Sequence, residues 1–507
     1  MIKSKSSTYV LTLKLNTQKF QEDVIDKRLE IARNISNSLT NKVLKRYKLM
    51  LESKEYNVIK KALKPINKAL YAEDMKHSRE FIKARKALYK ELNQIYLKYE
   101  LSQYSLHEDV KPMYKHFKDN IGSLEAQAIA NRVWTKFDKL LFGNGNGVNF
   151  DKVNEYNTIE NKWNKSGMRY FNRYILWQGL KLPIIINKKD YYAQKAIQDR
   201  IKFCRIVRKL IRGKYQYYVQ LMIEGVPPIK YDIKTGEIKH NVGLGNIGID
   251  IGTRTIAYSS KSEVKLLELC PEVDNIEHKK RILLRKLDRQ RRSNNPNNYN
   301  DNGTIKYGIK LVWNKSNKYI KTQNELRELQ RKQACIRKQS HERLANTIIS
   351  LGDRVLVETM QFQALQKRAK NITKDKNGKF NKKKRFGKSL ANKAPAMLLD
   401  IIDRKLKYDN LELLKINTQK VKASQYNHFT DEYNKKELSI RWNENIEVQR
   451  DLYSAFLIMN VSSDLEAINR QLCFETYDDF KLLHDKEIAR LRELKNNGCK
   501  LISSMGI

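Results

Sequence analysis

The chain is poor in cysteine, and the few cysteines that it has are far apart. None of the five belongs to a C-x-x-C pair. Neither a disulfide framework nor a zinc ribbon can be assembled from such spacing, because both need cysteines at short local intervals. We therefore expect five ordinary thiols: Cys204, Cys270, Cys335, Cys473 and Cys499.

Long apolar runs are also missing. No segment approaches the roughly 18–20 apolar residues of a membrane span, and the N-terminal residues M-I-K-S-K-S-S-T-Y-V lack the apolar core of a signal peptide. No basic amphipathic helix or lipidation signal is visible either. These absences exclude a membrane partner and predict a cytoplasmic protein.

Acidic residues are scarce beside basic ones. The 507 residues contain 100 Lys and Arg against 56 Asp and Glu, which gives a net charge of +44 spread along the whole chain. A polyanion is the natural partner, because neutralising phosphates releases counterions and supplies affinity. A ribosomal-type or merely alkaline protein is the alternative. The length and the hydrophobic content of 40% predict two to four folded domains.

The N-terminal part predicts a small β-barrel with a helical insertion. Residues 8–15 alternate as a strand, residues 18–182 show mainly helical periodicity, and residues 202–225 form two alternating runs that meet at Arg212, Gly213 and Lys214. We expect a barrel from residues 1–15 and 185–240, with a helical domain, residues 16–184, inserted between them.

The stretch N-I-G-I-D-I-G-T-R-T-I-A-Y-S-S, residues 246–260, places one acid in a buried strand. Gly248 and Gly252 flank Asp250, which indicates close approach of another backbone. A carboxylate in such a strand takes a partner, shifts its pKa or ligates a cation. The alternative is an acid in a β-turn.

A strongly basic helix follows over residues 279–292, with eight Lys or Arg against Asp288. A solvated helix face is the alternative to phosphate contact. A second helix, residues 322–351, leads into a short apolar strand, residues 353–358, whose C-terminal end presents Glu358. Residues 366–388 are too basic to pack, and we expect them to form a mobile loop that becomes ordered when it binds nucleic acid.

The third acid lies at a helix start. A helix is expected after Pro395, a strand at 411–416, and then a helix from about residue 449 with Asp451 beside its apolar stripe. Complementing the helix dipole, or capping the helix, is the alternative role of Asp451.

The order of these elements suggests one catalytic layout. A sheet that gathers acids from a central strand, a strand end and a helix start is the arrangement of ribonuclease H-like nucleases. Like charges of this kind are tolerable when divalent cations neutralise them, and hard oxygen ligands select Mg²⁺ or Mn²⁺. Two such ions support in-line phosphodiester hydrolysis. Asp250, Glu358 and Asp451 are therefore predicted as both catalytic and metal-binding residues.

Four segments together resemble a known family. G-I-D-I-G-T-R-T-I-A-Y, K-K-R-I-L-L-R-K-L-D-R-Q-R-R, R-K-Q-S-H-E-R-L-A-N-T-I before V-L-V-E-T-M, and Q-R-D-L-Y-S-A-F-L-I resemble TnpB, the RNA-guided nuclease of insertion sequences, and its relatives the compact type V CRISPR effectors. The resemblance is close over about residues 241–460 and loose before them. It implies an α/β multidomain protein with a RuvC-like nuclease domain, residues 241–416 and 449–460, beside a wedge-like barrel and a helical recognition domain.

The resemblance also implies partners and a setting. A guide RNA and double- and single-stranded target DNA would bind, in a bacterial protein that is associated with the nucleoid and a mobile element. The nucleic-acid-binding residues are then expected to be Lys279, Lys280, Arg281, Arg285, Arg289, Arg291, Arg292, Lys382, Lys383, Lys384, Arg385, Arg441 and Arg450.

One departure from the family concerns residues 417–448. The family has a four-cysteine zinc ribbon there, whereas this segment has no cysteine. We expect a target-binding module that holds its shape by packing around Tyr426, Tyr433 and Trp442, without zinc, and in which His428 is an ordinary surface or core histidine. A C-terminal tail, residues 461–507, carries a helix at 479–495.

Other functions fit parts of the pattern. A guided DNA-binding regulator that does not cleave, a compact CRISPR effector and a strand-joining transposase all share features of the sequence. G-x-D-x-G-T also opens the phosphate hairpin of sugar kinases and actin-like ATPases, but no second Asp-Gly-rich phosphate turn follows.

Overall fold

The computed structural model describes residues 7–70, 78–143, 145–232, 234–369, 371–374, 378, 380–381, 386–435, 437 and 439–507. The chain divides into two compact units, Met1–Pro228 and Ile229–Ile507. Residues 229–240, which the sequence assigned to the barrel, belong to the second unit. Within the described ranges, no helix combines the length and the apolar character that crossing a membrane requires.

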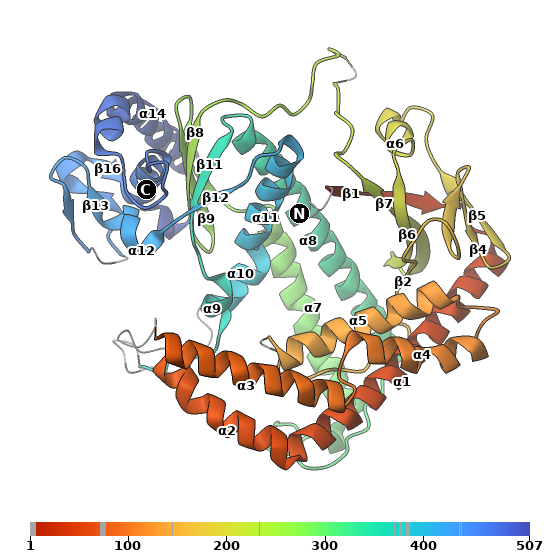
Figure 1. Ribbon diagram of the computed structural model, residues 1–507. Helices are drawn as coiled ribbons and strands as arrows, with labels where there is room; N and C mark the ends of the chain where they lie inside the picture. The colour runs from red at the N-terminus through yellow and green to blue at the C-terminus, as the bar shows by residue number, and fades with distance from the viewer. Residues whose placement is uncertain are drawn as a thin grey trace. The chain divides into compact units, whose positions relative to one another are not determined.

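The first unit is built around a seven-stranded antiparallel sheet in the order β2-β6-β7-β1-β5-β4-β3 (Figure 1). β1 (Thr8–Leu15) is the predicted first strand, and its apolar side chains are buried at every second position. β6 (Ile201–Ile211) and β7 (Lys214–Glu224) form the predicted hairpin, with Arg212 and Gly213 at positive φ in the turn. Over the described residues no pairing joins β2 to β3, so the sheet is open rather than a closed barrel.

Five helices precede most of these strands. They are α1 (Lys19–Glu52), α2 (Lys54–Ala69), α3 (Arg79–Lys98), α4 (Gln103–His116) and α5 (Ser123–Leu141), and they confirm a helical block after β1. A short helix, α6 (Tyr191–Ala196), follows later. The finer assignment of this unit as wedge and recognition domains stays a prediction.

The helical expectation was wrong for residues 158–184. Four strands occupy this region: β2 (Thr158–Glu160), β3 (Arg169–Phe171), β4 (Tyr174–Trp177) and β5 (Leu180–Ile185). Two tight turns connect the last three strands, with Asn172, Arg173, Gln178 and Gly179 all at positive φ. Turns of two residues at positive φ match the twist of a hairpin, and only one of these four residues is the glycine that would have signalled them.

The second unit holds a five-stranded sheet in the order β10-β9-β8-β11-β12. β8 (Asn246–Ile251), β9 (Thr255–Ser260) and β10 (Val264–Glu268) pair antiparallel, whereas β11 (Arg354–Glu358) and β12 (Leu414–Ile416) run parallel to β8. β8, β11 and β12 lie where the sequence predicts strands, although β12 is three residues shorter than expected.

Helices cover both faces of this sheet. The isoleucines of β8 pack with α8 (Asn317–Ile349) and α11 (Pro395–Leu406) on one side. On the other side lie α13 (Arg450–Met459) and α14 (Arg470–Asn496), which bring Phe456 and Phe480 into one core. The basic helix α7 (Val273–Asn294) packs along α8, and two short helices, α9 (Phe362–Gln366) and α10 (Gly387–Lys393), precede α11.

The C-terminal tail covers an edge of the sheet. α14 begins nine residues earlier than predicted, at Arg470, because the side chain of Asn469 caps it by accepting a hydrogen bond from Leu472 N. Glu487 of this helix accepts a hydrogen bond from Leu266 N of the outer strand β10 at 3.1 Å. The same carboxylate forms an ion pair with Lys265 at 3.2 Å. The tail therefore satisfies one backbone amide that an edge strand otherwise leaves unpaired.

The cysteine-free segment 417–448 contains α12 (Thr418–Val421) and two small pairs of strands, β13 (Tyr426–Asn427) with β14 (Glu432–Tyr433) and β15 (Trp442–Asn443) with β16 (Val448–Gln449). The Tyr426 and Tyr433 rings lie 4.9 Å apart, and Trp442 Nε1 donates to the carbonyl of Gly506 at 2.7 Å. Packing is thus confirmed for Tyr426, which is buried, and for Trp442, which packs on the same core, whereas Tyr433 is 48% exposed and only covers Tyr426. The absence of zinc stays a prediction.

His428 is a core histidine, which was one of its two expected settings. It is fully buried, and its Nδ1 lies 2.6 Å from the Tyr453 hydroxyl. The rings of Phe429, Phe456 and Tyr477 surround it within 5.9 Å. Burial, with a smaller effect of the Arg470 charge, lowers the pKa of His428 to about 4.

Candidate active site

Strand alternation directs Asp250 away from the isoleucine core. Ile247, Ile249 and Ile251 pack toward α8 and α11. Since successive side chains of a strand point to opposite faces, Gly248 and Asp250 face the α13 side of the sheet. The sequence therefore places one carboxylate, preceded by a residue without a side chain, on that face.

Parallel pairing brings Glu358 beside Asp250. The strand register pairs Ile249 of β8 with Val357 of β11, so Asp250 and Glu358 each stand one position beyond this pair. Val357 lies in the isoleucine core, and Glu358 consequently faces the same side as Asp250. The C-terminal ends of two neighbouring parallel strands thus supply two carboxylates.

Gly248 allows α13 to reach this face. A Cβ atom at residue 248 would overlap the carbonyl oxygen of Ala455 and the amide nitrogen of Met459, so the helix backbone lies directly on the strand. Asp451 is in the first turn of that helix, and Gln449, not Asp451, is the cap, because the Gln449 side chain accepts from Leu452 N. The capping alternative for Asp451 was therefore wrong.

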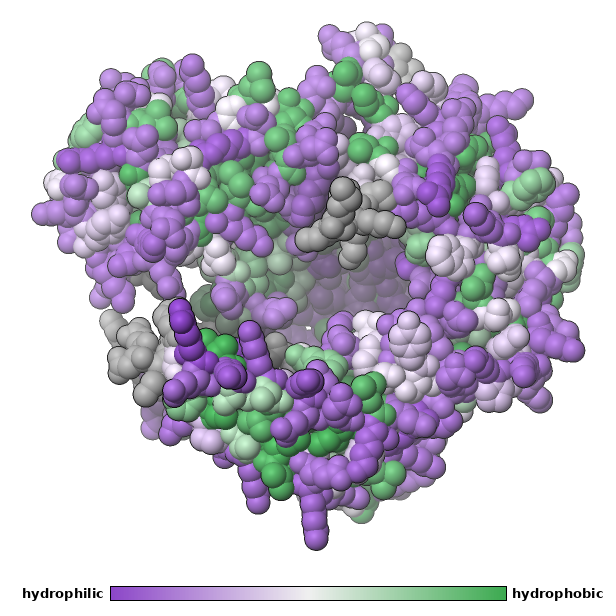
Figure 2. All heavy atoms as spheres, viewed as in Figure 1, coloured by the Kyte–Doolittle hydropathy of each residue, from purple (hydrophilic) through white to green (hydrophobic). Residues whose placement is uncertain are grey.

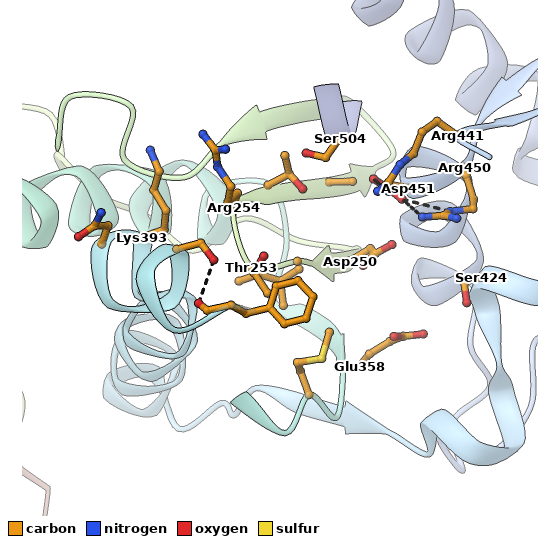
Figure 3. Close-up of a pocket in the computed structure, with 18 of the residues that line it drawn as sticks. Asp250, Thr253, Arg254, Glu358, Lys393, Ser424, Arg441, Arg450, Asp451 and Ser504 are labelled. Atoms are coloured by element: carbon orange, nitrogen blue, oxygen red, sulfur yellow. Dashed lines mark hydrogen bonds and ion pairs between the residues drawn. The ribbon is translucent and has the colours of Figure 1, made fainter. Parts of the chain in front are cut away.

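All three predicted acids line one cavity of about 1130 Å³. Figure 3 shows the carboxylates of Asp250 and Glu358 directed toward the side of the cavity where Asp451 lies. The turn after β8, the end of β11 and the start of α13 form this wall. Further polar lining comes from Thr253, Arg254, Asp274, Glu277, Arg281, Lys388, Lys393, Ser424, Lys435, Arg441, Arg450 and Ser504.

The charges of these acids disfavour one another. Burial first, and then the charges of Asp451 and Glu358, raise the pKa of Asp250 well above its usual range, while Arg450 and Arg441 oppose that rise. Burial also raises the pKa of Glu358. Such shifts are expected where carboxylates share a low-dielectric site, and they are frequent at functional sites.

Two arginines engage the third acid. Arg450 Nη2 lies 3.3 Å from Asp451 Oδ1, and Arg441 Nη1 lies 3.5 Å from Asp451 Oδ2 (Figure 3). Arg450 is itself fixed by a 2.9 Å hydrogen bond from its Nη1 to the carbonyl of Ile440. The Asp451 side chain is only 14% exposed, so this contact is shielded from much of the solvent.

The donor set fits a hard divalent cation. Three carboxylates face one cavity, and a dication would offset both the burial and the repulsion that raise the pKa of Asp250. In the part of the chain that the structure describes, however, no group of three or more His, Cys, Asp or Glu side chains already has metal-binding spacing. Asp451 faces its two arginines instead.

The chain was also compared with known proteins. No family model matches it, and no curated protein matches it. It is similar to a solved structure of a Cas12f1–sgRNA–target DNA complex, with 12% sequence identity and a TM-score of 0.42, over 90% of this chain and 99% of that chain. A second similar structure, a CRISPR–Cas12f ternary complex, has 14% identity and a TM-score of 0.23, over 89% of this chain and 99% of that chain.

The predicted nucleic-acid-binding residues of α7 divide into two groups. Lys280 pairs with Glu277 at 2.6 Å, and Arg291 and Arg292 both pair with Asp288. These three therefore already have partners inside the protein. The other four are exposed and make no ion pair with any described residue: Lys279, Arg281, Arg285 and Arg289. Figure 2 shows hydrophilic side chains over most of one face of the molecule.

The predicted residues Lys382, Lys383, Lys384 and Arg385 lie outside the described residues. Two others behave as part of the site, because Arg441 and Arg450 line the cavity and contact Asp451.

Lys393 is a site residue that sequence reasoning missed. It lines the same cavity and is 2% exposed, and its Nζ lies 2.8 Å from Glu268 and 3.1 Å from Asp274. The carbonyl of Cys270 accepts a third contact from it at 3.2 Å. Nothing in the local sequence distinguishes this lysine from the many exposed ones, because its partners come from a distant strand end and the start of α7.

Proposed function

We propose that the chain is a Mg²⁺-dependent, RNA-guided DNA endonuclease of a mobile element. The observation that carries the proposal is the presence of Asp250, Glu358 and Asp451 on one wall of a single cavity, although they come from three distant segments. The mixed sheet with three antiparallel and two additional parallel strands supports the expected ribonuclease H-like layout.

The carboxylates would hold the cations, which activate a water and stabilise the leaving oxygen of a phosphodiester when bound. Their raised pKa values mean that Asp250 and Glu358 hold a proton more readily than exposed carboxyls do, whereas only the ionised form ligates a cation. Attraction of cations and loss of these protons are therefore linked.

Arg441 and Arg450 have a second role in this scheme. In the nucleic-acid-free protein they neutralise Asp451. A phosphate that enters the cavity competes for the same guanidinium groups, because arginine binds phosphate and carboxylate with the same planar set of donors. Binding of the substrate would then release Asp451 toward the other two acids.

The guided character of the enzyme rests on the sequence resemblance to TnpB. The surface chemistry supports a nucleic-acid partner, since Lys279, Arg281, Arg285 and Arg289 are exposed along α7 without partners in the described structure. Such cations contact phosphates whatever the base sequence, which leaves the reading of sequence to base pairing.

A guided DNA-binding regulator that does not cleave is the second candidate. The observation in its favour is that Asp451 is paired with arginines and that the described residues contain no ready metal cluster. A plasmid-nicking assay with a matching guide separates the two candidates, because a regulator leaves the plasmid supercoiled at every metal concentration.

The direct test compares three proteins purified with their copurifying RNA. Wild type and the control variant Asp479→Asn, an exposed acid of α14, are expected to cut a matching plasmid in Mg²⁺. Asp250→Ala is expected to lose cleavage by a factor of at least about 10³ while it retains the same RNA. Cleavage by Asp250→Ala at the wild-type rate would reject the assignment of the site.

A further inference from the structure

The loop between α7 and α8, residues 295–316, exposes an unusual number of apolar side chains. The exposed fractions are 44% for Ile305, 100% for Tyr307, 62% for Ile309 and 70% for Val312. Single exposed apolar residues are common on protein surfaces, whereas several in one short stretch indicate an interaction site. None of these residues contributes to the cavity with the three acids.

Hydrogen bonds hold this α7–α8 loop in shape. The Asn295 side chain donates to the carbonyls of Arg291 and Asn314, at 2.9 and 3.0 Å, and accepts from Asn314 N at 2.6 Å. Asn298 Nδ2 donates to the carbonyl of Val312 at 2.7 Å, so the two arms of the loop are tied together. These bonds fix the base of the loop, from which the exposed side chains project.

Aromatic contacts brace the base of the loop. Tyr299 and Trp313 meet edge to face with ring centroids 5.8 Å apart. Arg291 lies over the Trp313 ring at 5.2 Å and Arg292 over the Tyr299 ring at 4.7 Å. These contacts use the inner aromatic rings and leave the ring of Tyr307 accessible on both faces.

The charge of the loop favours an anionic partner. Residues 295–316 contain three lysines and one aspartate, and Lys306 stands directly before Tyr307. Lys306 and Lys310 are exposed and form no ion pair with any described residue. An exposed aromatic ring with lysines on either side matches an unpaired base with its flanking phosphates. A second copy of this chain, at +44, would meet repulsion there.

We propose that the α7–α8 loop is a stacking platform for an unpaired base of single-stranded RNA, with Tyr307 beneath the base and Lys306 and Lys310 at the adjacent phosphates. We assign the unpaired base to RNA because folded RNA permanently displays unpaired bases in loops and bulges, and these bases stack on aromatic side chains. The identity of the partner as RNA rests on the proposed function, whereas the geometry of the platform does not.

The test measures binding of a fluorescein-labelled, 20-nucleotide oligouridine by anisotropy. Stacking of one base contributes about 1–3 kcal/mol, so Tyr307→Ala is expected to weaken binding about 5- to 150-fold, whereas Tyr307→Phe, which keeps the ring, stays within about twofold of wild type. The control is Tyr104→Ala, at a side chain that is 84% exposed on α4, and its affinity is expected to match wild type. Lys306→Gln combined with Lys310→Gln is expected to reduce the salt slope of log K by about 1.4.

Photo-crosslinking of the same RNA with 5-iodouridine locates the contact, and the peptide that contains Tyr307 is the expected product. Wild-type affinity in Tyr307→Ala without a crosslink at Tyr307 would overturn the platform. A larger loss for oligothymidine than for oligouridine would overturn the choice of RNA. Neither result depends on cleavage, so a failure of the nuclease proposal in Asp250→Ala is distinguishable from a failure of this one.

Discussion

Arg450 Nη2 lies 3.3 Å from Asp451 Oδ1, so the third carboxylate of the proposed metal set is paired with the residue that precedes it. Arg441 approaches the other oxygen of the same carboxylate at 3.5 Å. The two guanidinium groups supply positive charge at the place where a cation is proposed to bind. Metal affinity should therefore depend on whether these arginines are present.

Replacing Arg450 is expected to strengthen metal binding in the absence of nucleic acid. Ion pairs that keep some contact with solvent contribute up to about 1 kcal/mol, and loss of about 0.5–1 kcal/mol of this competing attraction should let Arg450→Ala bind Mn²⁺ about two- to fivefold more tightly than wild type. Titration of the RNA-free protein with Mn²⁺, followed by the paramagnetic resonance signal of the free ion, measures this. Arg254→Ala is the matched control, because Arg254 lines the same cavity but pairs with Glu268. Equal affinity of wild type and Arg450→Ala for Mn²⁺ would contradict the proposal that Arg450 and the cation compete for Asp451.

Gly248→Ala is expected to destabilise the second unit and to disturb the site together. The added methyl group meets backbone atoms of α13 rather than a movable side chain, and overpacking of this kind costs about 1–3 kcal/mol. Chemical denaturation followed by tryptophan fluorescence measures the loss. Gly252→Ala is the control, since the nearest contact of its Cβ would be Thr255 Oγ1 at 3.3 Å. A stable Gly248→Ala protein with normal metal affinity would show that α13 can shift without consequence.

Asp250→Asn is expected to stabilise the metal-free protein at neutral pH. The pKa of Asp250 is raised in the folded state, so the folded protein binds a proton more readily than the unfolded chain. The free energy of unfolding of wild type therefore falls as the pH rises from about 4 through the folded pKa. The melting temperature of the variant should exceed that of wild type by about 2–4 °C at neutral pH, and the difference should shrink toward about pH 4. A difference in melting temperature that stays constant between about pH 4 and neutral pH would argue against a raised pKa of Asp250.

His428 is expected to make the segment around it sensitive to acid. Its pKa is lowered to about 4 in the folded state, below the ordinary value of about 6.5. The unfolded chain thus gains a proton first, and the free energy of unfolding is lost as the pH falls from about 6.5 to about 4, by at most about 1.4 kcal/mol per pH unit. His428→Phe should weaken this dependence, although it also removes the 2.6 Å contact with Tyr453. His278→Gln, at an exposed site on α7, should retain it.

The sequence predicted the second unit better than the first, for a physical reason. Asp250 interrupts one short apolar run and Glu358 ends another, so each strand and its acid can be recognised from local sequence without knowing the partner strand. The turns at Asn172–Arg173 and Gln178–Gly179 convert residues 169–185 into strands, and three of these four residues are not glycine. Local sequence periodicity did not predict these strands, because the positive φ values of the turns are stabilised by pairing between the strands.

Pairing between distant residues was beyond the reach of the sequence. Arg441 was expected to contact nucleic acid, and nothing within its own segment indicates that it approaches Asp451 across a strand pair. The burial of Lys393 between Glu268 and Asp274 is similar, because three separate elements have to fold before the lysine has its partners. Buried lysine is also rare enough that composition argues against it.

The contact between Glu487 and the outer strand β10 has a consequence for handling the protein. Without α14, the amide of Leu266 and its neighbours would form a free template for strand addition by another molecule. A shortened chain that ends after α13 would then tend to oligomerise through its sheets and lose solubility, even though all three acids are present.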